Sequence, residues 1–153
     1  MIMSWKTLTL VLILAALALM AYIRLAPSDP KAWHIAIANG DAIPQGTCAD
    51  HITLVAKGAR AACILPLTPA AVLDKLEAIA LTSPRTLHLA GSAAEGRITW
   101  VSRSFLMGYP DYITAEVTQT AQGTRLDILS RQRFGEADLG VNAARLKDWL
   151  AQL

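Results

Sequence analysis

Hydrophobic and polar residues are distributed unevenly along this chain, and the sharpest change lies near its N-terminus. From Thr7 to Ala26 the sequence is apolar on every helical face, and Arg24 is the only charged residue. At about 1.5 Å per residue, a helix of this length spans about 30 Å, the thickness of the hydrocarbon core of a bilayer. The pattern predicts a membrane-spanning helix within residues 1–26, followed by a separate domain in residues 27–153.

A cleaved secretory signal peptide is the alternative interpretation of this segment, since signal peptides also combine a short basic start with an apolar run. The clear small-x-small motif at residues 16–18 would split the apolar run, and the triplet at residues 24–26 is followed by Pro27. We therefore expect a permanent anchor. The charges that flank the helix are nearly balanced, but a short head before a large domain favours a cytoplasmic N-terminus. This orientation places the C-terminal domain in the periplasm, on a bacterial inner membrane.

The pattern after the anchor predicts an α+β domain. Residues 27–30 form a stiff linker, because both prolines block helix continuation. Runs rich in β-branched and aromatic residues predict strands, and two segments have apolar residues at helical spacing. The expected strands are 33–38, 51–56, 61–67, 86–90, 97–106, 112–118 and 124–133, and the expected helices are 69–81 and 140–152. This order predicts an antiparallel sheet with helices packed on one face, preceded by one N-terminal transmembrane helix.

Charge and histidine spacing argue against nucleic acid as a partner and against a metal site. The chain has 14 basic and 12 acidic residues, and Lys6 and Arg24 belong to the anchor region, so residues 27–153 are close to neutral. The sequence lacks the clustered basic patch that nucleic-acid-binding proteins show. The three histidines are His34, His51 and His88. None of them has the spacing to another histidine or to a cysteine that metal ligands usually show.

Two cysteines, Cys48 and Cys63, form an even count in a domain that we expect in an oxidising compartment. A bridge between them would close a loop of about 15 residues and stabilise the fold by about 3 kcal/mol. A hairpin that turns at residues 57–60 would place Cys63 opposite Leu54, with Cys48 up to about 20 Å away along an extended chain. A disulfide and two separate thiols therefore stay open as alternatives.

Polar residues are concentrated in the last expected strand and at the start of the last helix. Period-two geometry puts Arg131 and Arg133 on one face of the strand, and Asp138 lies where a helix N-terminus favours a carboxylate. One interpretation is a site where guanidiniums and a helix N-terminus bind a phosphate or carboxylate, such as a lipid headgroup. The structural alternative is that these residues cap the helix and hold it to the sheet. The candidate residues are Arg131, Arg133, Asp138, Asn142 and Arg145.

The same stretch resembles the signature of a known family. The residues that carry the resemblance are Ser130, Arg131, Arg133, Gly135, Asp138, Leu139, Gly140, Asn142 and Arg145, accompanied by Gly108–Tyr112 and Ser83–Thr86. With these spacings, residues 69–153 are similar to the domain-of-unknown-function 1499 family, although Gln132 stands where many members have serine. The resemblance implies a bacterial or plastid protein that is often associated with the cell envelope, and it supplies no catalytic residues.

Three functions are consistent with these features. The sequence contains no Gly-x-Ser-x-Gly elbow and no phosphate-binding glycine loop, so we expect a protein that is not an enzyme and needs no cofactor. The first hypothesis is an accessory subunit that docks on a larger integral membrane complex of respiratory or photosynthetic type. Small residues that allow close helix packing support it: Ala15, Ala16, Ala18 and Ala21. The second hypothesis is an envelope module that binds membrane lipid or another anion, and the third is an envelope hydrolase.

Overall fold

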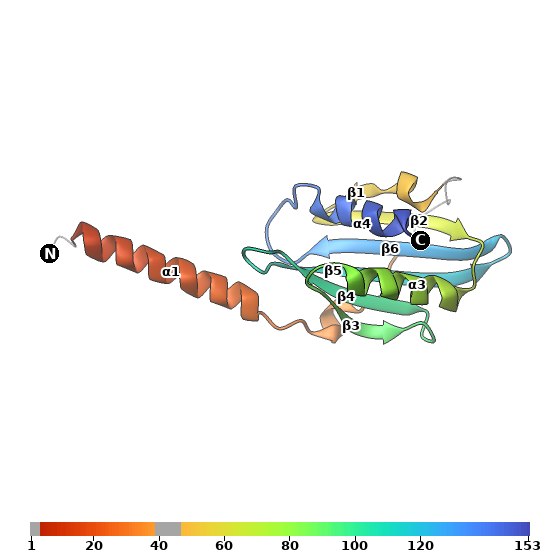
Figure 1. Cartoon of the computed structure of the whole chain (residues 1–153), viewed down its shortest axis with the longest axis horizontal. Helices are drawn as coiled ribbons and strands as arrows, with labels where there is room; N and C mark the ends of the chain where they lie inside the picture. Colours follow the sequence, from red (N-terminus) through yellow and green to blue (C-terminus); the bar gives the residue numbers. More distant parts are fainter. Residues whose placement is uncertain (1–3, 39–46) are drawn as a thin grey trace.

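The structure, a computed structural model, describes residues 4–38 and 47–153. In Figure 1, α1 (Trp5–Leu25) projects from one end of an α+β domain. Within the described residues, six strands form one antiparallel sheet in the order β1-β2-β6-β5-β4-β3. The strands are β1 (Thr53–Val55), β2 (Gly58–Leu65), β3 (Thr86–Ser92), β4 (Arg97–Arg103), β5 (Pro110–Thr120) and β6 (Gly123–Gln132). The predicted fold class, an antiparallel sheet with helices and an apolar N-terminal helix, is confirmed.

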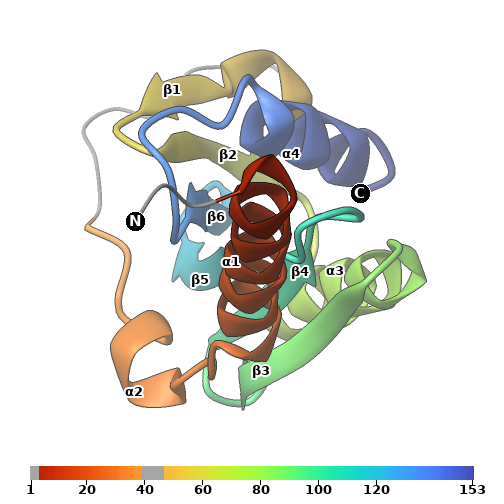
Figure 2. The same ribbon diagram turned by 90° about the vertical axis from the view of Figure 1, so that its left-hand side faces the viewer.

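Two helices, α3 (Pro69–Thr82) and α4 (Val141–Ala151), cover one face of the sheet, which we call the helix face (Figure 2). The helix α3 begins after Thr68, whose hydroxyl accepts a hydrogen bond from a backbone N–H of the first turn, and proline is tolerated at its first position. Trp100 of β4 and Trp149 of α4 meet edge to face with ring centroids 5.6 Å apart, and both are buried. The main hydrophobic core lies between this face and the two helices.

The opposite face of the sheet is partly covered by residues 27–38, which we call the strap. The strap contains α2 (Pro30–Trp33), a single helical turn that begins at the cap residue Asp29. The prediction of a first strand over 33–38 is wrong, since Trp33 ends α2 and residues 34–38 pair with no strand in the described part of the chain. An aspartate cap followed by proline favours a helical start. The extended residues after it bond to side chains of the sheet instead of to a strand edge.

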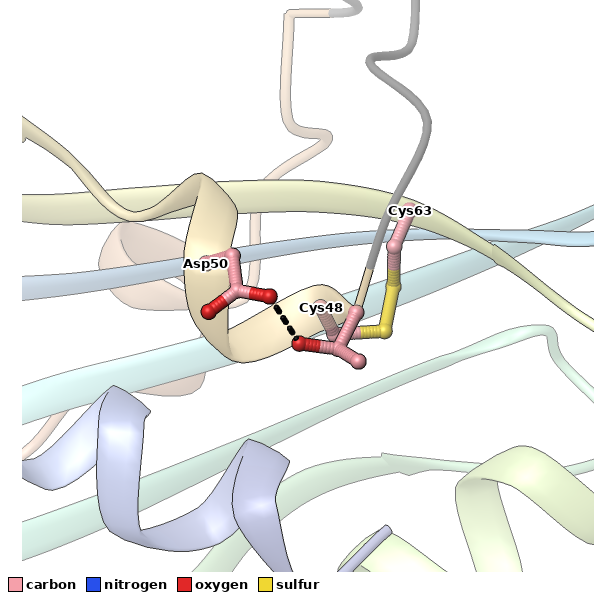
Figure 3. The surroundings of a disulfide bond; sticks show 4 residues. Cys48, Asp50 and Cys63 are labelled. Atoms are coloured by element: carbon pink, nitrogen blue, oxygen red, sulfur yellow. Dashed lines mark hydrogen bonds between the residues drawn. A yellow bond between two sulfur atoms is a disulfide. The ribbon is translucent and has the colours of Figure 1, made fainter.

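The hairpin between β1 and β2 turns earlier than predicted, and this shift brings the cysteines together. Val55 pairs with Gly58, so the turn consists of Ala56 and Lys57 and not of residues 57–60. The short helix η1 (Cys48–His51) precedes β1 and folds the chain back toward β2. Cys48 and Cys63 form a disulfide bond with a Cα–Cα distance of 5.1 Å, which joins η1 to β2 (Figure 3).

Candidate functional site

The polar residues near the C-terminus are divided between the two faces of the sheet. Successive side chains of a strand point to opposite faces, so Ser130 of β6 lies on the helix face and Arg131 lies on the face covered by the strap. The structure brings Asn142 and Arg145 to Ser130, and it places Arg131 and Arg133 away from them. The guanidiniums of the two strand arginines therefore do not converge with the start of α4.

On the helix face, four polar side chains form one network that ties α4 to β5 and β6. The Arg145 guanidinium donates to Ser130 Oγ at 3.2 Å, to Asn142 Oδ1 at 2.8 Å and to Asp111 Oδ2 at 3.0 Å. Ser130 Oγ also donates to Asn142 Oδ1, and both of these residues are fully buried. Burial raises the pKa of Asp111, although the charge of Arg145 and its hydrogen bond act in the opposite direction.

Asp138 caps α4. Its carboxylate accepts hydrogen bonds from the backbone N–H groups of Asn142 at 2.9 Å and Gly140 at 3.1 Å. Burial opposes the charged form, but these hydrogen bonds outweigh burial and lower the pKa of Asp138. The start of α4 is therefore occupied by the chain itself. The structural alternative described above also has Asp138 as the cap of this last helix.

On the other face, Arg131 and Arg133 hold the strap through its backbone. Arg131 donates to the carbonyl oxygen of Trp33, and its guanidinium lies 5.4 Å from the centroid of the Trp33 ring. The same indole stacks on Tyr112, with centroids 3.8 Å apart and planes 9° apart. Arg133 donates to Pro27 O at 2.7 Å. Burial lowers the pKa of Arg131, as expected for a cation shielded by aromatic rings.

Further along, the strap bonds to polar side chains of β4 and β5. His34 Nδ1 lies 2.9 Å from Thr99 Oγ1, and the backbone N–H of Ile37 donates to Glu116 Oε2 at 2.9 Å. Glu116 is also paired with Arg97 of the neighbouring strand at 3.0 Å. The strap is thus attached from Pro27 to Ile37 to this face of the sheet, which we call the strap face.

The C-terminal end of α1 is attached to the same end of the domain. Arg103 donates to the carbonyl oxygens of Ala26 and Gly108, both at 3.0 Å, while Arg24 donates to the carbonyls of Phe105 at 3.1 Å and Leu106 at 2.6 Å. Gly108 has a φ of +70°, and a Cβ atom at this position would lie 2.7 Å from Cγ of Arg24. A glycine is therefore required where α1 approaches the β4–β5 loop.

Two hollows open at this α1-proximal end of the domain. The first, of about 340 Å³, lies between the β4–β5 loop and the β6–α4 loop, and Tyr109, Asp111, Phe134 and Asp138 are among its lining residues. The second, of about 290 Å³, is lined by Arg24, Arg85, Leu87, Arg103, Ser104, Phe105 and Gly108, and we call it the arginine groove. No cluster of three His, Cys, Asp or Glu side chains within residues 4–38 and 47–153 is suited to hold a metal ion.

The sequence pointed to Arg131 and Arg133, but not to the other residues that attach α1 and the strap to the domain. These are Arg24, Arg103, Trp33 and Tyr112. Of these residues, Arg24 is the one that the sequence could have identified. A lone charge at the end of an apolar helix is costly unless it has a function or a polar partner. Trp33 and Tyr112 carried no signal, since their contact depends on the strap crossing a sheet face that no local pattern identifies.

The chain was compared with known protein families and with curated proteins. No curated protein matches it. The model of the family described as "Protein of unknown function (DUF1499)" matches residues 27–153. This match extends the resemblance seen over residues 69–153 so that it also covers the strap, the disulfide and the first hairpin. Because the match covers well over half of the sequence, the chain belongs to the DUF1499 family of proteins of unknown function.

Proposed function

We propose that this protein is a non-catalytic, membrane-anchored accessory subunit that docks on a larger integral membrane complex of respiratory or photosynthetic type. The observation that carries the proposal is the continuity between α1 and the folded domain. Ile23 and Ala26 are only 3% and 5% exposed, and their carbonyl oxygens accept hydrogen bonds from Arg103. Cleavage after the 24–26 triplet would remove Ile23 from this packing, and cleavage after the 16–18 motif would leave only a short apolar piece of α1 on the domain. The contact therefore supports a permanent anchor.

The disulfide supports a location outside the cytoplasm. Structural disulfides persist in oxidising compartments such as the bacterial periplasm, whereas cytosolic thiols are kept reduced. We therefore place the domain on the periplasmic side of a bacterial inner membrane, with residues 1–4 on the cytoplasmic side. A C-terminal alkaline phosphatase fusion tests this orientation, because the phosphatase is active only after export. An inactive fusion that is stably expressed would contradict it.

The surface of α1 is available to a membrane partner. The helix is long and apolar enough to cross a membrane, and only 6% of its most apolar window is buried within the described chain. The alanines at positions 15, 16, 18 and 21 would let a second helix approach closely. The hydrogen bonds between the end of α1 and the domain would then limit how the domain sits on the partner complex.

Extraction in a mild detergent followed by native sizing tests the docking proposal. We expect the natural chain to migrate with a companion complex, and Ala18→Leu to release it by adding bulk to the helix surface. Ile13→Leu is the matched control, since it changes side-chain shape in the same helix without adding volume. If the natural chain migrates only at its own mass in detergent, the accessory-subunit proposal fails.

A further inference from the structure

The arginines that line the arginine groove lack acidic partners. Among the described residues, none of Arg24, Arg85 and Arg103 forms an ion pair with a carboxylate, whereas Arg97 at the start of β4 pairs with Glu116. Three positive charges that meet without a counter-charge repel one another, and an anion bound between them would relieve this repulsion. The groove therefore has the charge of an anion site.

The guanidiniums of Arg24 and Arg85 still have free donors, while Arg103 holds the groove in shape. Arg85 Nε donates to the carbonyl oxygen of Arg103 at 3.0 Å, and its two terminal nitrogens make no hydrogen bond within the described part of the chain. Arg24 uses only Nη2 for its bonds to the β4–β5 loop. A guanidinium fork with free N–H groups matches the geometry of a phosphate.

Exposed apolar side chains surround this positive groove. Leu25 is 80% exposed at the end of α1, and Phe105 and Leu106 are 78% and 68% exposed in the β4–β5 loop. Arg85 lies over the ring of Phe105, with 5.5 Å between its Cζ atom and the ring centroid. Apolar side chains interleaved with unpaired cations are typical of surfaces that enter the boundary between headgroups and acyl chains.

The position of the groove along α1 places it at the surface of the membrane. Trp5 and Tyr22 lie near the two ends of the helix, 17 positions apart, which is about 26 Å at 1.5 Å per residue. Aromatic residues with this separation mark the two interfaces of a bilayer. The ring of Tyr22 also meets the ring of Phe134 in the β6–α4 loop, with centroids 6.4 Å apart, so this end of the domain lies at the depth of the headgroups.

We propose that the arginine groove binds the phosphate of an anionic phospholipid headgroup in the membrane that α1 crosses, and that Phe105 and Leu106 insert beside it. The domain would then rest against the bilayer on its α1-proximal end. This inference depends on the proposed permanent anchor but not on any partner complex. It differs from the anion site expected from the sequence, because Arg131 and Arg133 donate to the strap.

Spin labelling of the full chain in nanodiscs tests this proposal. Each variant carries one added cysteine, and the nanodiscs contain phosphatidylcholine alone or with an increasing share of phosphatidylglycerol. The native cysteines are bridged, so a label attaches only to an added cysteine. Leu106→Cys reports on the groove, Gln122→Cys reports on the far end of the domain in the β5–β6 turn, and Leu12→Cys reports on α1 (Figure 1). Accessibility to oxygen and to a water-soluble nickel chelate gives the depth of each label.

We expect the Leu106→Cys label to become immobile and shielded from nickel as phosphatidylglycerol is added, while the Gln122→Cys label stays in water. Arg85→Gln should raise the share of phosphatidylglycerol needed for half of this change by about fivefold, which corresponds to about 1 kcal/mol for one basic residue near an anionic surface. Lys147→Gln, on the exposed side of α4, removes the same charge away from the groove and should have no effect.

Three results would overturn the inference. A Leu106→Cys label as exposed to nickel as the Gln122→Cys label would show that this end does not touch the membrane. A buried label that responds neither to phosphatidylglycerol nor to Arg85→Gln would show apolar contact without headgroup binding. If the Leu12→Cys label is also exposed to nickel, α1 is not inserted and the anchor proposal fails as well; a lipid-buried Leu12→Cys label keeps the two failures apart.

Discussion

The two faces of the sheet use polar residues for different purposes. On the helix face, Ser130, Asn142 and Arg145 form a hydrogen-bond network that also includes Asp111. If α4 left the sheet, these hydrogen bonds would break. On the strap face, Arg131 and its neighbours donate to backbone carbonyls of a segment that lies outside the main core. The comparison indicates that the helix-face network contributes to global stability, whereas the strap-face contacts decide where α1 and the strap are attached.

The largest expected effect is the loss of the helix-face network. Arg145→Ala would leave the carboxyl group of Asp111 buried without its cation, and breaking a buried ion pair in this way costs about 4 kcal/mol. Denaturant unfolding of the full chain in mild detergent, followed by the fluorescence of the buried Trp100 and Trp149, measures this loss. Lys147→Ala, on the exposed side of the same helix, is the matched control. Equal unfolding midpoints for the two variants would contradict the role given to the network.

The second effect in size concerns the disulfide, which lies on the helix face beside α4. Cys48→Ser with Cys63→Ser removes a cross-link with a sequence separation of 15 residues, and we expect a loss of about 3 kcal/mol. The same unfolding measurement applies, and reduction of the natural chain should give the same midpoint as the double variant. A double variant as stable as the natural chain would mean that η1 is held by packing alone.

Much of the helix face could be predicted from the sequence, because local patterns determine it. Apolar residues at every second position in β5 and β6 identify the side of the sheet that faces the core, and the pair Thr68-Pro69 marks the start of α3. The same alternation placed Arg131 and Arg133 on one face, which agrees with their common contact with the strap.

The strap face could not be predicted in the same way. A single helical turn such as α2 is too short to show any periodicity, and Trp33–Ala38 resembles a strand in composition alone. The acceptors that Arg131 and Arg133 use are backbone carbonyls, and every residue type has one, so the sequence contains no sign of them. The disulfide depended on a hairpin turn whose position differed by only a few residues from the predicted one.

A smaller and more local effect is expected on the strap face. Trp33→Ala removes the stacking on Tyr112, which we expect to weaken strap attachment by about 1 kcal/mol and to leave global unfolding nearly unchanged. Trypsin cleavage after Lys31 in α2 should become about fivefold faster, in line with that energy, while cleavage after Lys75 in α3 should keep its rate. Global destabilisation as large as that of Arg145→Ala would show that the two faces are not distinct.

The smallest effect is a pH dependence of the far end of the strap. Burial opposes the charge of Glu116, but hydrogen bonds from Arg97 and from the N–H of Ile37 outweigh burial and lower its pKa. A carboxyl group with a lowered folded-state pKa contributes stability that is complete above its ordinary value of 4.5 and is lost as the pH falls through the lower folded value. The protection factor of the Ile37 amide in hydrogen exchange should therefore fall in acid, below pH 4.5.

Glu116→Gln separates this step from the titration of the nearby histidine. The glutamine keeps an acceptor for the Ile37 N–H but has no charge to lose, so the fall in protection below pH 4.5 should disappear. Burial and the charge of Arg97 lower the pKa of His34. Protonation of His34 should therefore cause a separate fall in protection that begins near its ordinary pKa of 6.5 and extends below it. The variant should leave this second fall in place. If the fall below pH 4.5 persists in the variant, Glu116 is not the group that titrates, and its bond to the Ile37 N–H does not set the acid response of the strap.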